Sequence, residues 1–189
     1  MDDLRKEILG LVRRYAGSQE AKPWRAGEDM VPYGGRVVGA EERVNLVNAS
    51  LDCWLTLGEY GAKFEAGLKK FLGARDVVLV NSGSSADLVA LSALCSPSVE
   101  NPLRPGAEVI TPAVTFPTTL APILQNGLIP VFVDCEMGTY NADLDQMEAA
   151  VSPRTRALVL PHTLGNVPDI DRVTAICRKS GLRLIEDAC

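Results

Sequence analysis

The sequence is poor in residues on which several classes of protein depend. One histidine, His162, is too few for a multi-histidine metal site or an HExxH protease. Nineteen basic residues against 24 acidic ones give a net charge of -5, so the chain lacks a basic footprint for nucleic acid. The five cysteines are odd in number and widely spaced, which favours a reduced, cytoplasmic protein over a disulfide framework. They are Cys53, Cys95, Cys135, Cys177 and Cys189.

Long apolar runs are also missing. None approaches the roughly 20 residues that a membrane helix needs, and the N-terminus mixes charges into an amphipathic pattern without secretory signal architecture. We therefore expect no membrane partner. What the chain has is 189 residues, 47% of them hydrophobic, which is enough to bury the core of an ordinary globular domain.

The first 39 residues predict an N-terminal helix and an extended arm. Apolar residues recur close to a 3.6-residue period over residues 2–16, which indicates a helix that packs poorly by itself. Glycines and prolines then punctuate residues 21–39 and indicate an extended loop. Two further helical patterns follow, at 40–53 and 59–72, and we expect residues 40–189 to form part of one larger domain.

From residue 74 the pattern changes to alternating strands and helices. Continuous apolar runs are typical of strands covered on both faces, and Gly73, Gly127 and Gly181 stand where left-handed helix caps are expected. Repeated strand–helix–strand units predict an α/β fold with three layers, α/β/α, around a mostly parallel sheet. The predicted strands are Val77–Val80, Glu108–Thr111, Ile129–Val133, Ala157–Leu160 and Leu182–Ile185, and a helix is predicted at Asp169–Ser180.

The sequence stops directly after the last predicted strand and its acidic pair, Glu186 and Asp187. In open α/β sheets, ligands bind at the carboxyl ends of the strands. We therefore expect residues 40–189 to be the N-terminal part of a larger domain in a longer protein.

The segment around Ser82–Ser85 joins a predicted strand to a helix rich in alanine and leucine. Small hydroxyl residues at a helix start can cap free N–H groups, and the same N–H groups with the helix dipole form a site for phosphate. A plain serine cap is an equal alternative. The segment is neither a Walker A loop nor GxGxxG, and Asp87 stands where G-x-S-x-G needs its second glycine.

Three more candidates follow strands. Aromatic residues are only 5% of the chain, and Phe116 could stack on a flat ligand ring, although a core phenylalanine is the favoured alternative for it alone. Asp187 follows an apolar strand, where a carboxylate needs a partner. A pyridinium nitrogen would fit, because the charge keeps it protonated and the ring then accepts electrons. His162 also lies just past a predicted strand and is a possible site residue. The alternatives are a helix cap for Asp187 and a hydrogen-bonded structural role for His162.

Together these candidates suit pyridoxal 5'-phosphate (PLP) or pyridoxamine 5'-phosphate (PMP). They would provide a phosphate-binding turn, an aromatic ring that stacks on the cofactor, and a carboxylate that pairs with its ring nitrogen. In their order along the chain, these segments resemble the DegT/DnrJ/EryC/StrS sugar aminotransferases, which are fold-type I PLP enzymes. The resemblance spans about Pro32 to Cys189 and implies that Gly83, Ser84 and Ser85 bind phosphate, that Phe116 stacks on the ring, and that Asp187 binds the pyridine nitrogen. The segments are Ser82–Ala86, Glu108–Pro112, Thr115–Phe116, Pro130–Asp134, Thr139–Tyr140 and Ile185–Ala188.

Within that family the sequence is most similar to the CDP-4-keto-6-deoxyglucose 3-dehydrase branch of lipopolysaccharide and dideoxysugar biosynthesis. This resemblance implies that a histidine replaces the Schiff-base lysine and that the cofactor stays as PMP. It also implies a 2Fe–2S cluster whose first ligand matches Cys189, with the other cysteines downstream. An ordinary buried cysteine is an equal alternative. The segments are Val37–Glu41, Ala49–Thr56, Phe116–Thr119, Gln125–Pro130 and His162–Asn166.

The activity that the resemblance implies is loss of the C3 hydroxyl from a nucleotide-linked keto-sugar in a homodimeric enzyme. The cofactor amine would condense with the C4 ketone, a base would remove a proton from the cofactor methylene, and a reductase partner would supply electrons. The residue at the Schiff-base position would lie beyond Cys189 and is not His162, so residues 1–189 alone are expected to be inactive. The alternatives are a PLP-dependent transaminase on a nucleotide-linked keto-sugar and a non-catalytic α/β binding module.

Overall fold

The computed structural model describes residues 3–19, 23–31 and 34–188. The chain divides into two units, Met1–Leu79 and Val80–Cys189. The boundary predicted at residue 39 falls inside the first unit and stays a prediction about domain organisation.

The first unit contains three helices close to the predicted ranges: α1 (Asp3–Gly17), α2 (Ala40–Leu51) and α3 (Glu59–Leu72). Polar contacts join α1 to the α2 region. The Arg5 guanidinium donates to the Asn48 side chain at 2.7 Å and pairs with Asp52 at 2.6 Å.

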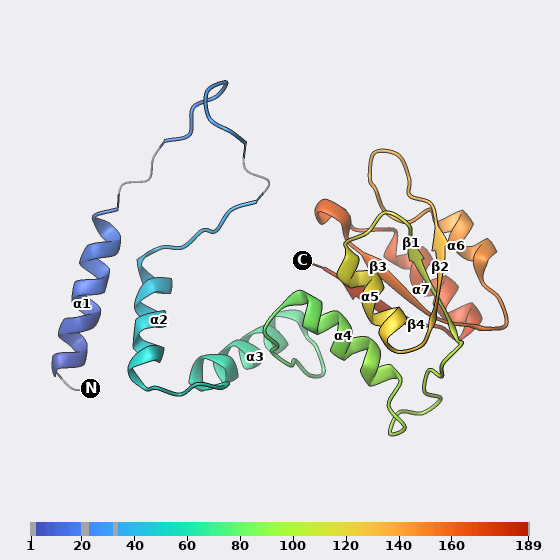
Figure 1. The fold of residues 1–189 in the computed structure, drawn as a ribbon, viewed down its shortest axis with the longest axis horizontal. Coiled ribbons are helices and arrows are strands. Elements are labelled where there is room, and N and C mark those ends of the chain that lie inside the picture. The colour runs from blue at the N-terminus through green and yellow to red at the C-terminus, as the bar shows by residue number, and fades with distance from the viewer. Residues whose placement is uncertain (1–2, 20–22, 32–33, 189) are drawn as a thin grey trace. The chain divides into compact units, whose positions relative to one another are not determined.

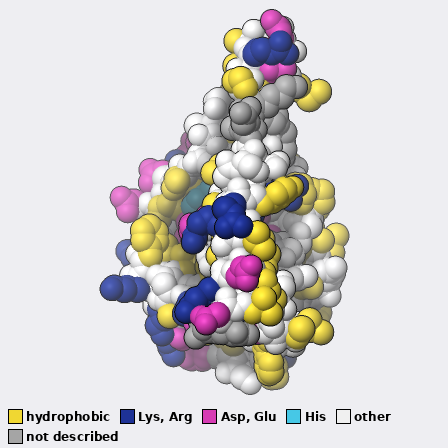
Figure 2. Space-filling view, turned by 90° about the vertical axis from the view of Figure 1, so that its left-hand side faces the viewer, with side chains coloured by type: hydrophobic (Ala, Val, Ile, Leu, Met, Phe, Trp, Pro, Cys, Tyr) yellow, Lys and Arg dark blue, Asp and Glu magenta, His cyan; other side chains and the backbone are white. Residues whose placement is uncertain are grey.

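This unit has little core of its own. Helix α1 buries no residue, and among the described residues of this unit Val44 is the only large hydrophobic side chain that is buried. Hydrophobic side chains therefore reach the surface among basic and acidic ones (Figure 2). The expectation of a poorly packed N-terminal helix is confirmed.

The strand predicted over Val77–Val80 does not form in the described part of the chain, and this prediction was wrong. A strand needs a neighbour that pairs with its amides and carbonyls. Here the Leu79 amide donates to the Glu65 carboxylate of α3 at 2.8 Å, and Val78 is largely exposed. An apolar run alone does not supply the partner strand.

The second unit is built on a parallel sheet (Figure 1). Its strands are β1 (Glu108–Pro112), β2 (Ile129–Val133), β3 (Thr155–Pro161) and β4 (Arg183–Asp187), in the spatial order β2-β1-β3-β4. All the pairings between these strands are parallel, as predicted. The central strands β1 and β3 are buried, whereas β2 and β4 are half-exposed because each lies at an edge.

Helices cover both faces of this sheet, which confirms the predicted three layers. On one face, α4 (Gly83–Leu94) and α5 (Pro117–Gln125) pack on Val109 and Val159. On the other, α6 (Leu144–Ala150) and α7 (Ile170–Ser180) pack on Ile110 and Leu158. A 3-10 turn, η1 (Thr163–Gly165), follows β3. Among the residues that the structure describes, no helix is both long and apolar enough to cross a membrane.

The glycine caps lie where the sequence predicts them. Gly73 after α3 and Gly181 after α7 adopt left-handed conformations, with φ of 62° and 64°. Gly127, two residues beyond the end of α5, has φ of 69°. Because a Cβ is strained in this region, glycine lets each helix end and the chain turn toward the next segment.

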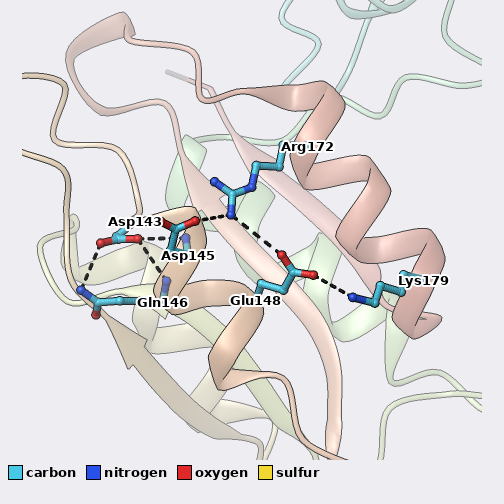
Figure 3. Close-up of polar contacts among 6 residues, drawn as sticks. All are labelled: Asp143, Asp145, Gln146, Glu148, Arg172 and Lys179. Atoms are coloured by element: carbon cyan, nitrogen blue, oxygen red, sulfur yellow. Dashed lines mark hydrogen bonds and ion pairs between the residues drawn. The ribbon is translucent and has the colours of Figure 1, made fainter.

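A polar network joins α6 to α7 at the surface (Figure 3). Asp143 caps α6 by accepting from the Asp145 and Gln146 amides at 2.9 and 3.0 Å. Arg172 of α7 pairs with Asp145, and Lys179 pairs with Glu148 at 2.8 Å. The network fixes α6 against α7 on the face opposite α4 and α5.

Candidate functional site

The phosphate seat predicted at Ser82–Ser85 is the first turn of α4. Ser82 is the N-cap, and its hydroxyl accepts from the Ser85 amide at 3.1 Å. The first amides of a helix have no intrahelical partner. The serine cap satisfies one of them, while the Gly83 and Ser84 amides stay open to a ligand in the described part of the chain. Both interpretations of this segment thus fit the same turn. Ser82 is the cap, and the Gly83 and Ser84 amides can donate hydrogen bonds to an anion.

A groove runs beside this turn. Ser84, Ser85 and Leu88 line it from α4, and Thr118 and Gln125 are among the α5 residues that line it. Phe116 and Asp187 are not part of its lining.

Phe116 begins α5. It is the residue before Pro117, at the N-cap position, and its side chain is 65% exposed. The alternative of a core phenylalanine was therefore wrong for the described structure. An aromatic ring at the carboxyl end of β1 is free to lie against a planar ligand.

Asp187 is the last residue of β4, and strand geometry sets its direction. Side chains alternate between the two faces of a sheet. Leu184 packs in the α6–α7 core and Ile185 in the α4–α5 core, so Asp187 points to the α4–α5 side. There the buried Thr119 hydroxyl donates to Asp187 Oδ2 at 2.7 Å and orients the carboxylate.

Asp87 is a site residue that the sequence reasoning missed. It lies on α4, is only 9% exposed, and its carboxyl group faces that of Asp187. Burial and the negative charge of Asp187 raise the pKa of Asp87 to about 6. The available signal was helical spacing: Asp87 is four residues before Leu91 and therefore shares the buried face of an otherwise apolar helix.

His162 does not join this group. Its Nε2 lies 3.0 Å from Glu186 Oε2, and Glu186 points to the face opposite Asp187. The His162 amide donates to the Asp187 carbonyl at 2.9 Å, which links the ends of β3 and β4. These contacts fit the structural alternative for His162.

Two buried threonine hydroxyls at this end of the sheet lack a hydrogen-bond partner among the described residues, which indicates that a polar ligand binds beside them. Thr111 Oγ1, at the end of β1 on the α4–α5 face, and Thr115 Oγ1, next to Phe116, have no hydrogen-bond partner within the described chain. Buried hydroxyls are normally paired. The site therefore fits a phosphorylated pyridine. It combines amides on α4 that can donate hydrogen bonds to an anion, an aromatic ring on α5 and an oriented carboxylate on β4.

Cys189, the predicted cluster ligand, lies outside the described residues. Among those that are described, no group of three or more His, Cys, Asp or Glu side chains could hold a metal ion. The iron–sulfur cluster stays a prediction.

Comparison with known proteins gives close relatives. The lipopolysaccharide biosynthesis protein RfbH of Salmonella typhimurium is 48% identical over 100% of this chain and 44% of its own length. The dTDP-4-dehydro-2,6-dideoxy-D-glucose 3-dehydratase of Saccharopolyspora spinosa is 48% identical over 99% of this chain and 41% of its length. The chain thus spans less than half the length of these relatives.

Solved structures agree. A GDP-4-keto-6-deoxymannose-3-dehydratase with a trapped PLP-glutamate geminal diamine matches with a TM-score of 0.70 and 35% identity, over 77% of this chain and 38% of that one. The family model described as the DegT/DnrJ/EryC1/StrS aminotransferase family matches residues 38–189. The chain belongs to the DegT/DnrJ/EryC1/StrS aminotransferase family.

Proposed function

We propose that this chain forms part of the cofactor site of a PLP- or PMP-dependent enzyme that removes the C3 hydroxyl of a nucleotide-linked 4-keto-6-deoxy sugar. The observation that carries the proposal is the oriented Asp187 carboxylate, which lies at the same end of the sheet as the open amides of α4. The similarity to two sugar 3-dehydratases supports dehydration in particular.

Each residue has a defined task in this proposal. The Gly83 and Ser84 amides, with the Ser84 and Ser85 side chains, bind the phosphate at the positive end of the α4 dipole. Phe116 packs on the ring, and Asp187, held by Thr119, keeps a proton on the pyridine nitrogen. When bound, the cofactor supplies an amine for the sugar ketone and a ring that accepts electrons.

The substrate proposed first is CDP-4-keto-6-deoxyglucose, with a role in lipopolysaccharide O-antigen biosynthesis. The 48% identity to a lipopolysaccharide biosynthesis protein supports it. A cytoplasmic homodimer, a 2Fe–2S cluster that begins at Cys189, and a reductase partner complete the proposal. Iron content and a visible spectrum of the purified intact protein test the cluster, and an absence of iron after anaerobic purification would remove it.

The second candidate is transamination of a nucleotide-linked keto-sugar, which the family's aminotransferase description supports. Product analysis separates the two. Dehydration gives a 3-deoxy sugar, whereas transamination with glutamate gives an amino sugar.

The test compares two neighbouring carboxylates in the intact protein that carries this chain. Asp187→Ala should abolish turnover, because the ring nitrogen loses its counter-charge. Glu186→Ala is the matched control, because Glu186 lies on the same strand but faces the other side. Turnover and far-UV circular dichroism are measured for both variants, and normal turnover by Asp187→Ala would contradict the proposal.

A further inference from the structure

A pocket of about 360 Å³ opens at the end of the sheet opposite the proposed cofactor site. Arg156, the second residue of β3, and Arg183, the first residue of β4, both line it, whereas Asp187 is the last residue of β4. A strand rises about 3.3 Å per residue, so β4 separates the two sites by roughly 13 Å. The volume is in the range of small-ligand sites, and a ligand bound here would be distinct from the cofactor.

The pocket combines positive charge with buried side chains. Within the described structure, no Asp or Glu is among its lining residues. Burial raises the pKa of the Cys177 thiol, so this side chain stays neutral and does not offset the positive charge. The charged lining residues are Arg156, Arg178 and Arg183, and the buried ones are Leu103, Cys177 and Leu182.

The guanidinium groups are not neutralised by any carboxylate. Arg156 donates to two backbone carbonyls, each at 2.7 Å, and Arg183 donates to a third at 3.0 Å. Arg178 forms no hydrogen bond or ion pair with any described residue. By contrast, nearby Arg154 pairs with the Glu108 carboxylate at 2.5 Å. Because a carbonyl carries no net charge, its hydrogen bonds hold an arginine in place and leave the positive charge unbalanced.

We propose that this pocket binds a phosphoryl group, at a site separate from the one proposed for the cofactor. Three unbalanced positive charges favour a ligand with more than one negative charge, and a phosphoryl group carries about 1.5 to 2 at neutral pH. The planar guanidinium group suits this ligand because it donates two parallel hydrogen bonds to phosphate oxygens. Two of the arginines are already held by carbonyls, so binding costs less side-chain entropy.

The experiment measures the binding of inorganic pyrophosphate to the intact protein by isothermal titration calorimetry. The protein is saturated with PLP, which keeps pyrophosphate away from the proposed phosphate site at Ser82–Ser85. A protein that does not take up PLP is titrated without it, since the pocket does not depend on the proposed function.

Two substitutions test the pocket, and a third is the matched control. Arg178→Gln removes a charge without breaking a contact to a described residue, and we expect at least a fivefold loss of affinity with an unchanged circular dichroism spectrum. We expect a similar loss for Arg183→Gln. Arg104→Gln is the control, because Arg104 is exposed in the same unit but does not line the pocket, and its affinity should stay within about twofold of wild type.

Three results would overturn the inference. Wild type that does not bind pyrophosphate would show that no such site exists. Equal affinity for wild type and Arg178→Gln would place the ion elsewhere, and an equal loss for Arg104→Gln would show only diffuse attraction between charges. If Arg183→Gln does not fold, Arg178→Gln decides alone.

A second titration, with CDP, distinguishes two sources of the phosphoryl group. If the pocket serves a nucleotide, Arg178→Gln should weaken CDP binding by the same factor as pyrophosphate binding. If it serves a free phosphate or pyrophosphate ion, Arg178→Gln should weaken pyrophosphate binding and leave CDP binding unchanged. Both results support a phosphoryl site in this pocket.

Discussion

At the scale of single residues, the site depends on the side chains that hold Asp187 in place. Thr119 and Asp87 both contact Asp187, and neither has a sequence motif of its own. Asp187 and the Ser82–Ser85 turn follow predicted strands, so they could be identified from the sequence. Asp87 could not, because its importance comes from β4, which is 100 residues away along the chain.

The raised pKa of Asp87 makes a prediction about stability. A carboxyl group that binds its proton more tightly when folded stabilises the folded state at low pH, and this contribution is lost as the pH rises from about 4 to 6. Asp87→Asn should therefore stabilise the apoprotein above pH 6, by about 1–3 kcal/mol, and not below pH 4. Urea unfolding at pH 4 and pH 8 measures this, and equal stability changes at both pH values would contradict it.

At the scale of elements, the sequence predicted most helices and strands but not what lies beside them. Strands β1 to β4 form within a few residues of their predicted ranges, because each apolar run has a neighbour in the same unit. Val77–Val80 has the same pattern and no pairing partner among the described residues, so it stays irregular. An apolar run shows that a segment favours burial, but whether it forms a strand depends on a neighbouring strand with which it can pair.

The α6–α7 network gives a prediction at this scale. Backbone hydrogen bonds from Gln146 and Asp145 lower the pKa of Asp143, so the stability that this cap contributes is present above pH 4 and is lost as the pH falls through the lowered value. Asp143→Ala should lower the thermal midpoint at pH 7 by a few degrees, and by less at pH 3.

Arg172→Ala is the comparison for that cap, because Arg172 makes exposed ion pairs that salt and side-chain entropy weaken. Its effect on the thermal midpoint at pH 7 should be the smaller of the two. A larger loss for Arg172→Ala would show that the ion pairs, and not the cap, hold α6 in place.

At the scale of the molecule, the chain combines a three-layer unit with an N-terminal unit that buries little. The former presents Gly83, Ser84, Phe116 and Asp187 around one end of its sheet, while the latter leaves hydrophobic side chains exposed. The fold class followed from the strand–helix alternation. The chemistry came from residues at strand ends, and their joint arrangement needed the three-dimensional structure.

A crystal structure of the intact protein with PLP would show directly whether these residues hold the cofactor. We expect the phosphate at the Gly83 and Ser84 amides, the ring against Phe116, and the pyridine nitrogen within hydrogen-bond distance of the Asp187 carboxylate. A ring nitrogen directed away from Asp187, with the phosphate bound at another helix, would contradict it.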